Sequence, residues 1–157
     1  MKAASLNEIR KELQFTDPEK IADICLRLAR YKKENKELLT YLLFESGNEP
    51  AYVLYVKEEM AAMFEELPRG NIYFSKKGLR KILRFVNRQI KYSDVKSTEL
   101  ELRIHFCSRV KKSGVPIAKS PVLANLYSQQ IKKINAVLSR LPEDLRFDYQ
   151  RDIDALG

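Results

Sequence analysis

The most suggestive chemical feature of the sequence is a row of cations in the segment 75–92. If this segment is a helix, a turn of about 100° per residue places all seven cations within an arc of about 140°. Leu79, Ile82 and Val86 fall on the opposite side, and the segment contains no acidic residue. The seven cations are Lys76, Lys77, Arg80, Lys81, Arg84, Arg88 and Lys91. A row of this kind can neutralise phosphates and release their counterions, which is the chemistry of polyanion recognition.

Three interpretations of this row stay open. The cations are solvated or paired with acidic residues of the same chain; or they bind nucleic acid; or they bind an acidic protein or an anionic membrane surface. The membrane interpretation is the weakest, because the apolar side of the helix should already pack on the protein core. Aromatic residues that alternate with the cations and could stack on unpaired bases are Tyr73, Phe74, Phe85 and Tyr92.

Residues suited to catalysis or metal binding are few. His105 is the single histidine of the chain, and Glu101 lies one helical turn before it. We interpret these two residues as an ordinary surface pair, and Cys107 as a core cysteine. The five glycines form no phosphate-binding loop of a known spacing. The sequence therefore predicts no catalytic residue, metal site or cofactor, and favours a non-enzymatic protein.

Length and composition set the broad class. A chain of 157 residues with 45% hydrophobic and 32% charged residues is typical of one globular domain, here spanning 1–157. No apolar run approaches the length of a membrane-spanning helix, so we expect no membrane insertion. The N-terminus lacks the apolar core of a secretion signal, and two cysteines cannot form a disulfide framework, so we expect a cytoplasmic protein. The oligomeric state stays open.

The net charge of +8 is unevenly distributed. Residues 67–142 carry 17 basic and 3 acidic residues, a net charge of +14. The flanking segments 1–66 and 143–157 carry a net charge of −3 each. Such a block of positive charge must be solvated, matched by the acidic ends or bound to an anionic partner.

Capping residues, prolines and apolar periodicity predict an all-α fold of seven or eight helices. We expect the apolar segment 36–44 to lie at the centre, and a cap near Ser75 to begin the helix of the cation row. Residues 98–106 alternate between apolar and polar as a strand would, but their composition favours a helix. On that helix Arg103 falls among apolar residues, so either it has a dedicated carboxylate partner or the helix assignment is wrong.

A repeat in the apolar positions further predicts that the helices stack. The apolar positions Ile21, Ile24 and Leu28 match Leu79, Ile82 and Val86 at a constant offset. On this basis we expect stacked hairpins, and we take as a hypothesis two three-helix units, 17–66 and 75–140, that stack as armadillo or HEAT repeats do. The leading functional prediction is a helical binding module whose basic face meets an anionic partner, with nucleic acid the most concrete candidate. The alternative is an adaptor for an acidic protein, or a basic face that is only solvated or internally paired.

Overall fold

The computed structural model describes residues 1–157 and is all-helical, as the sequence predicts. It contains eight α-helices, one π-helical turn, one 3-10 turn and no strand. In chain order these elements are α1 (Leu6–Gln14), α2 (Pro18–Tyr31), α3 (Lys33–Thr40), η1 (Tyr41–Glu45), α4 (Glu49–Glu65), α5 (Ile72–Ser93), α6 (Lys96–Lys112), η2 (Ile117–Lys119), α7 (Pro121–Leu138) and α8 (Glu143–Asp154). They fall into two compact units, Met1–Phe44 and Glu45–Gly157.

In the first unit, α1, α2 and α3 are amphipathic but bury almost no side chain. The Ser5 hydroxyl accepts a hydrogen bond from Glu8 N, and the Glu8 carboxylate accepts one from Ser5 N, which begins α1 as a capping box. Tyr41 is the single buried residue of this unit. The prediction that 36–44 is a central helix is wrong, because Leu43 and Phe44 are 65% and 76% exposed. An apolar run is buried only where other elements cover it.

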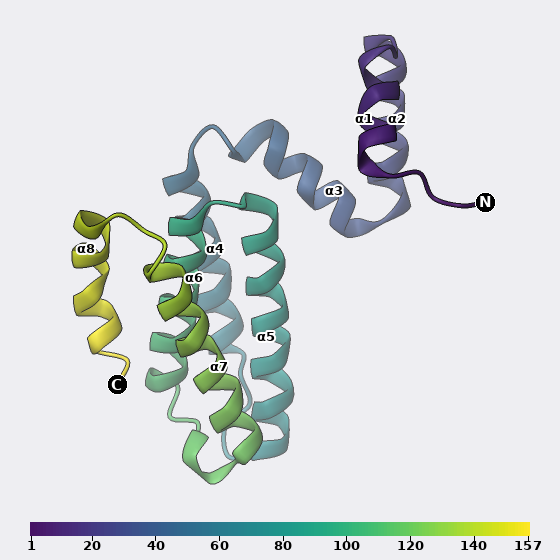
Figure 1. Ribbon diagram of the computed structural model, residues 1–157. Helices are drawn as coiled ribbons and strands as arrows, with labels where there is room; N and C mark the ends of the chain where they lie inside the picture. Colours follow the sequence, from purple (N-terminus) through teal and green to yellow (C-terminus); the bar gives the residue numbers. More distant parts are fainter. The chain divides into compact units, whose positions relative to one another are not determined.

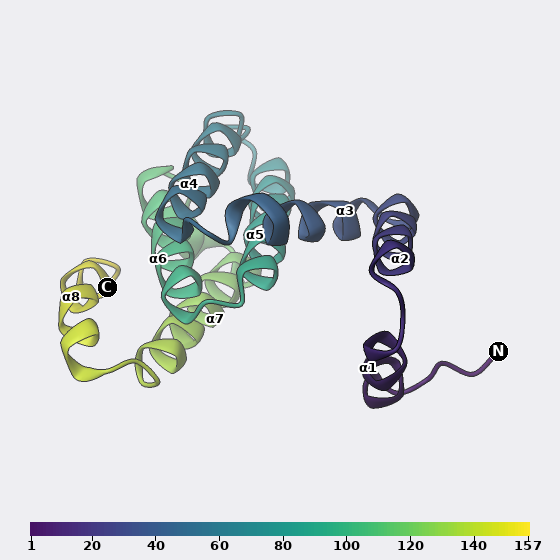
Figure 2. The ribbon, with the colours of Figure 1, turned by 90° about the horizontal axis from the view of Figure 1, so that it is seen from above.

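In the second unit, α4, α5, α6 and α7 run alternately in opposite directions along one bundle, and α8 lies beside α6 (Figure 1). Helix α6 is the central element, since it packs against α4, α5 and α7. Viewed from above, α8 and α5 lie on opposite sides of the bundle, with α6 and α7 between them (Figure 2). Consecutive antiparallel helices of this kind are the expected hairpins.

The central position of α6 explains its misleading sequence pattern. Residues 98–106 are helical, so the strand alternative is wrong. On a helix, Leu100, Leu102, Ile104 and Phe106 cover an arc of about 200°, and all four are buried. A helix covered on several sides shows no narrow apolar stripe, and its alternation then imitates a strand.

The stacking of two repeats stays a prediction. The boundary between the two compact units falls after Phe44, inside the first proposed repeat of 17–66. The assignment of 1–157 to one domain likewise stays a prediction, and each unit is described by itself.

Candidate anion-binding face on helix α5

Helix α5 carries the whole row of cations, and its first residues are well fixed. Asn71 caps the helix, because its side-chain oxygen accepts hydrogen bonds from Tyr73 N at 2.9 Å and Phe74 N at 3.4 Å. The cap expected near Ser75 is Asn71, four residues earlier in the chain. Ser75 is instead a buried residue whose hydroxyl donates to Pro68 O at 2.9 Å and to Asn71 O at 3.0 Å. These bonds hold the preceding loop against the helix.

Gly78 has a packing role inside α5, where glycine is otherwise unfavourable. A Cβ atom at this position would lie 2.4 Å from Leu67 Cδ1. The loop before α5 thus packs directly on the helix backbone at Gly78. Together with the buried residues Leu79, Ile82 and Val86, this contact fixes which side of α5 faces the core.

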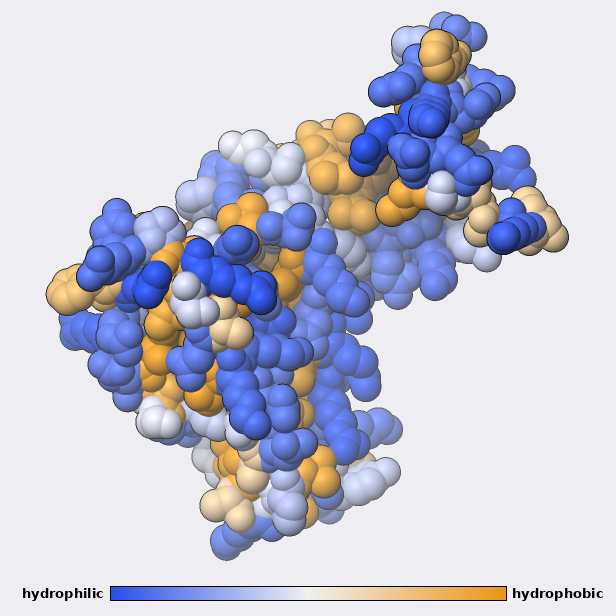
Figure 3. Space-filling view, viewed as in Figure 1, coloured by the Kyte–Doolittle hydropathy of each residue, from blue (hydrophilic) through white to orange (hydrophobic).

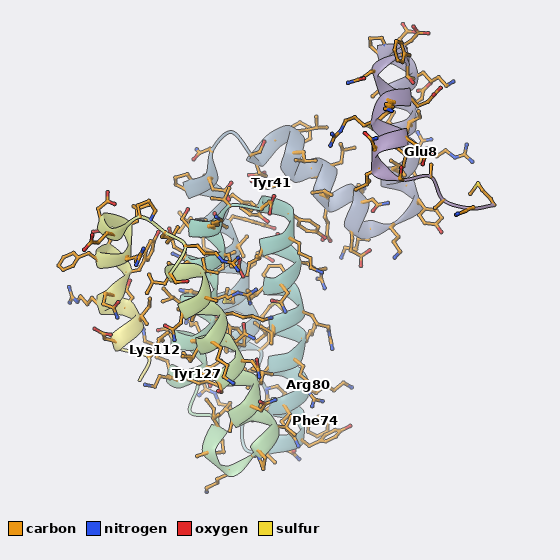
Figure 4. The ribbon with its side chains drawn as sticks, in the orientation of Figure 1. Glu8, Tyr41, Phe74, Arg80, Lys112 and Tyr127 are labelled. Carbon is orange, nitrogen blue, oxygen red and sulfur yellow. The ribbon has the colours of Figure 1, made fainter.

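The opposite side of α5 presents the cations to solvent. Five of the seven are exposed, and Lys76 and Arg88 are half-buried. The ion pairs of the molecule are Lys33–Glu37, Lys57–Glu101 and Arg103–Glu99, so none of the seven cations lies within 4.0 Å of a carboxylate. Arg80 and Phe74 project from the outer side of α5 (Figure 4). The row is thus a surface without internal counter-charges at contact distance.

The acidic C-terminal segment of the chain is attached to α6 and α7. Helix α8 is tied to α6 by Tyr149, whose hydroxyl donates to Glu101 Oε1 at 3.1 Å. The turn after α8 is held by Tyr127, which donates to Leu156 O at 2.9 Å, and by Lys111, which donates to Ala155 O at 3.4 Å. Within the second unit, α8 and α5 lie on opposite sides of the bundle, so its width separates the acids of α8 from the α5 cations (Figure 2).

Exposed aromatic side chains stand at the start of the cation row. Tyr73 is 62% exposed and Phe74 50% exposed, and their rings meet edge to face with centroids 5.3 Å apart. By contrast, Tyr92 is buried and Phe85 is half-buried. Of the four aromatics suggested by the sequence as stacking platforms, Tyr73 and Phe74 are the ones with free ring surface.

Helix α7 adds milder polar character next to α5. Arg103 of α6 reaches both helices. Its Nη1 atom donates to Asn87 on α5 at 3.0 Å and to Gln130 on α7 at 2.8 Å. Hydrophilic residues cover most of the face on which α7 and α5 lie (Figure 3).

The residues weighed for catalysis do not form the expected surface pair. Glu101 accepts hydrogen bonds from Lys57 at 2.9 Å and from Tyr149, not from His105. Burial, reinforced by the charges of Lys57, Arg109 and Lys112, lowers the pKa of His105 to about 4, and its buried Nε2 atom has no hydrogen-bond partner. Cys107 is a core residue as expected, and burial raises its thiol pKa to about 12. No group of three or more His, Cys, Asp or Glu side chains converges on a common metal position.

Sequence reasoning did not group the cations of a second site. The end of α6 and the loops at 66–71 and 113–120 bring four of them together around one cavity: Arg69, Arg109, Lys112 and Lys119. Because these residues come from separate segments, no periodicity along one helix could have grouped them. The sequence signals were their common position in the strongly basic segment 67–142 and the position of Lys112 and Lys119 on either side of the Gly114 turn.

Comparisons with known proteins found no protein similar to this chain. No protein-family model matches the chain, and neither curated proteins nor solved structures show a significant similarity to it. None of the helices combines the length and the apolar character needed to cross a bilayer.

Proposed function

We propose that this protein is a nucleic-acid-binding module that contacts the phosphate backbone with the outer face of α5. The observation that carries the proposal is the row of seven cations on one helix, none of which has a carboxylate within ion-pair distance. Neighbouring like charges one turn apart on a helix are mutually destabilising. An anionic partner would remove that cost, and a row of phosphates matches its linear form.

The dimensions of the row fit this partner. From Lys76 to Lys91 it extends along α5 for about 22 Å, at the helical rise of about 1.5 Å per residue. Arg80, Arg84 and Arg88 are spaced one turn apart along it, and arginine is well suited to phosphate because its planar group donates two hydrogen bonds at once.

The aromatic pair favours single-stranded over duplex nucleic acid. Tyr73 and Phe74 offer exposed ring surface beside the cations, and bases stack on such rings only when they are unpaired. We therefore propose a strand that runs along α5, with one or two bases on this pair. A cytoplasmic location is part of the proposal, because both cysteines are free thiols.

Fluorescence anisotropy with labelled oligonucleotides tests the proposal. If the five exposed cations contact phosphates, the logarithm of affinity should fall against the logarithm of salt with a slope of about −3.5 for a single strand. Affinity should then drop about 10²-fold between 50 and 200 mM salt. The triple variant Arg80→Glu, Arg84→Glu, Arg88→Glu should lose measurable binding at the higher salt.

The matched control reverses three exposed arginines of the first unit: Arg10→Glu, Arg27→Glu and Arg30→Glu. It changes the net charge by the same amount and should retain binding. Absence of binding at low salt, or equal losses in the two triple variants, would overturn the proposal. Capture of one stoichiometric acidic protein, lost in the α5 variant, together with no oligonucleotide binding would instead assign the face to a protein partner.

A further inference from the structure

A cavity of about 560 Å³ lies at the end of the bundle where α5 begins and α6 ends. Its walls are the loop 66–71, the first turn of α5, the last turn of α6 and the segment 113–119. All of these belong to the second unit, and none of the seven α5 cations lines the cavity. Its size lies in the range of small-molecule sites.

The charge of the cavity is positive and unbalanced. Arg69, Arg109, Lys112 and Lys119 line it together with one acid, Glu65, and none of the four cations is in an ion pair. Arg109 and Lys112 also stabilise the C-terminal end of α6, where cations are favoured. That effect explains the positions of Arg109 and Lys112. It does not explain Arg69 and Lys119, which belong to other segments.

The rest of the lining is largely apolar. Phe64 and Leu67 come from the core, while Ile72, Val115 and Pro116 complete the wall. A cationic rim around an apolar wall matches a ligand that has an anionic end and a flat, weakly polar body.

The walls are already held in place without a ligand. The Ser75 hydroxyl bonds to Pro68 O, and Leu67 packs over Gly78, so the loop that carries Arg69 is anchored on α5. On the other side, Gly114 adopts a φ of +74°, a left-handed conformation that glycine permits at a helix end. A preformed wall lowers the entropy cost of binding.

We propose that this cavity binds a nucleotide, with its phosphomonoester on the four cations and its base against the apolar wall. A phosphomonoester carries close to two negative charges at neutral pH and three acceptor oxygens, which suits several Arg and Lys donors at once. The nucleotide is either free or the phosphorylated end of a strand. The pocket shares no residue with the α5 row and does not depend on the function proposed for that row.

Isothermal titration calorimetry of the full chain with AMP tests the site. AMP should bind. Adenosine lacks the phosphate and inorganic phosphate lacks the base, so each should bind at least about tenfold more weakly than AMP. The variant Lys112→Glu, Lys119→Glu should weaken AMP binding about tenfold or more. Its control, Lys132→Glu, Lys133→Glu, reverses two exposed lysines of α7 and should bind AMP as the parent does.

Three outcomes would overturn the site: no AMP binding at millimolar concentration, equal losses in the two double variants, or equal affinity for AMP and a simple dicarboxylate. The α5 triple variant separates the two proposals, since it should lose oligonucleotide binding and keep AMP binding. A gain in affinity when a trinucleotide carries a 5′-phosphate, relative to its 5′-hydroxyl form, identifies a strand end as the source. Equal affinities of those two forms, with AMP binding retained, identify the free nucleotide.

Discussion

Arg103 shows how one residue can join three helices. It is 6% exposed, and its guanidinium donates to Glu99 at 2.8 Å and to Asn87 and Gln130. The need for a carboxylate partner followed from the apolar surroundings of Arg103 on its helix, and Glu99 supplies that carboxylate. The two amide partners lie on other helices and belong to the tertiary structure.

Loss of this side chain should be costly. We expect Arg103→Met to lower the free energy of unfolding by about 3 kcal/mol, because it leaves Glu99 and Gln130 without their donor. Urea denaturation measures the loss. Arg84→Met, at an exposed arginine without an ion pair, should change stability by less than about 0.5 kcal/mol. Similar losses for the two variants would contradict a structural role for Arg103.

His105 should make the stability of the protein depend on pH. Its pKa is about 4 in the folded protein against 6.5 ordinarily, so the unfolded chain binds a proton that the folded chain does not. The resulting stability is complete above pH 6.5 and is lost as the pH falls toward 4. Because the side chain is only half-buried, we expect an effect of about 1–2 kcal/mol.

Urea midpoints of the parent and of His105→Gln at pH 7 and pH 5 isolate this effect, since the carboxylates titrate in both proteins. The parent should lose more stability than the variant between these two pH values. An equal loss would show that His105 does not contribute.

The two thiols should differ sharply in reactivity. Cys107 is fully buried and its thiol pKa is raised to about 12, whereas Cys25 is half-exposed. Since the thiolate is the reacting form, a disulfide reagent should label one thiol per chain rapidly, and the second only as the protein unfolds. Cys25→Ser should remove the rapid phase. Rapid labelling of two thiols in the folded protein would contradict the burial of Cys107.

At the scale of elements, helix ends and helical periodicity could be predicted from the sequence. Which helix lies at the centre of the bundle could not. Ser5 followed by Glu8 at capping-box spacing, and Ser120 followed by Pro121, are sequence patterns that predict the start of a helix, and α1 and α7 begin there. The central helix was misassigned to 36–44, since apolar content alone does not reveal which neighbours cover a helix. The central helix is α6, whose many buried positions obscure its period.

Gly78 gives a test at this scale. Replacing a helical glycine with alanine normally stabilises by about 1 kcal/mol, but here the new Cβ would meet Leu67. We expect Gly78→Ala to be neutral or destabilising by about 1 kcal/mol in the parent, because Leu67 must move. In a Leu67→Ala background the same change should stabilise by about 1 kcal/mol. Urea denaturation measures both effects. Equal effects in the two backgrounds would show that the contact between Leu67 and the helix backbone does not require glycine at position 78.

At the scale of the whole molecule, the two compact units differ in how much core they possess. The unit Glu45–Gly157 contains nearly all buried residues, including Met60, Val86 and Phe106, whereas Met1–Phe44 buries Tyr41 alone. Cooperative unfolding requires a buried apolar core, because packing in that core must offset the conformational entropy of the chain.

We therefore expect a fragment of residues 45–157 to retain a sharp urea transition by circular dichroism. A fragment of residues 1–44 should show weak helicity that declines gradually with urea, as isolated short helices do. A gradual transition of the longer fragment, or a sharp one of the shorter, would contradict this division of stability.

By itself, the sequence determined the helices, most of their ends, the arc of seven cations along one of them and the buried environment of Arg103. All of these depend on residues within a few positions of one another, where helix geometry alone sets the spacing. Only the tertiary structure decided that α6 is central, that Tyr92 is buried while Tyr73 and Phe74 are exposed, and that cations from separate segments surround one cavity. These features depend on contacts between residues far apart in the chain, and no local spacing encodes them.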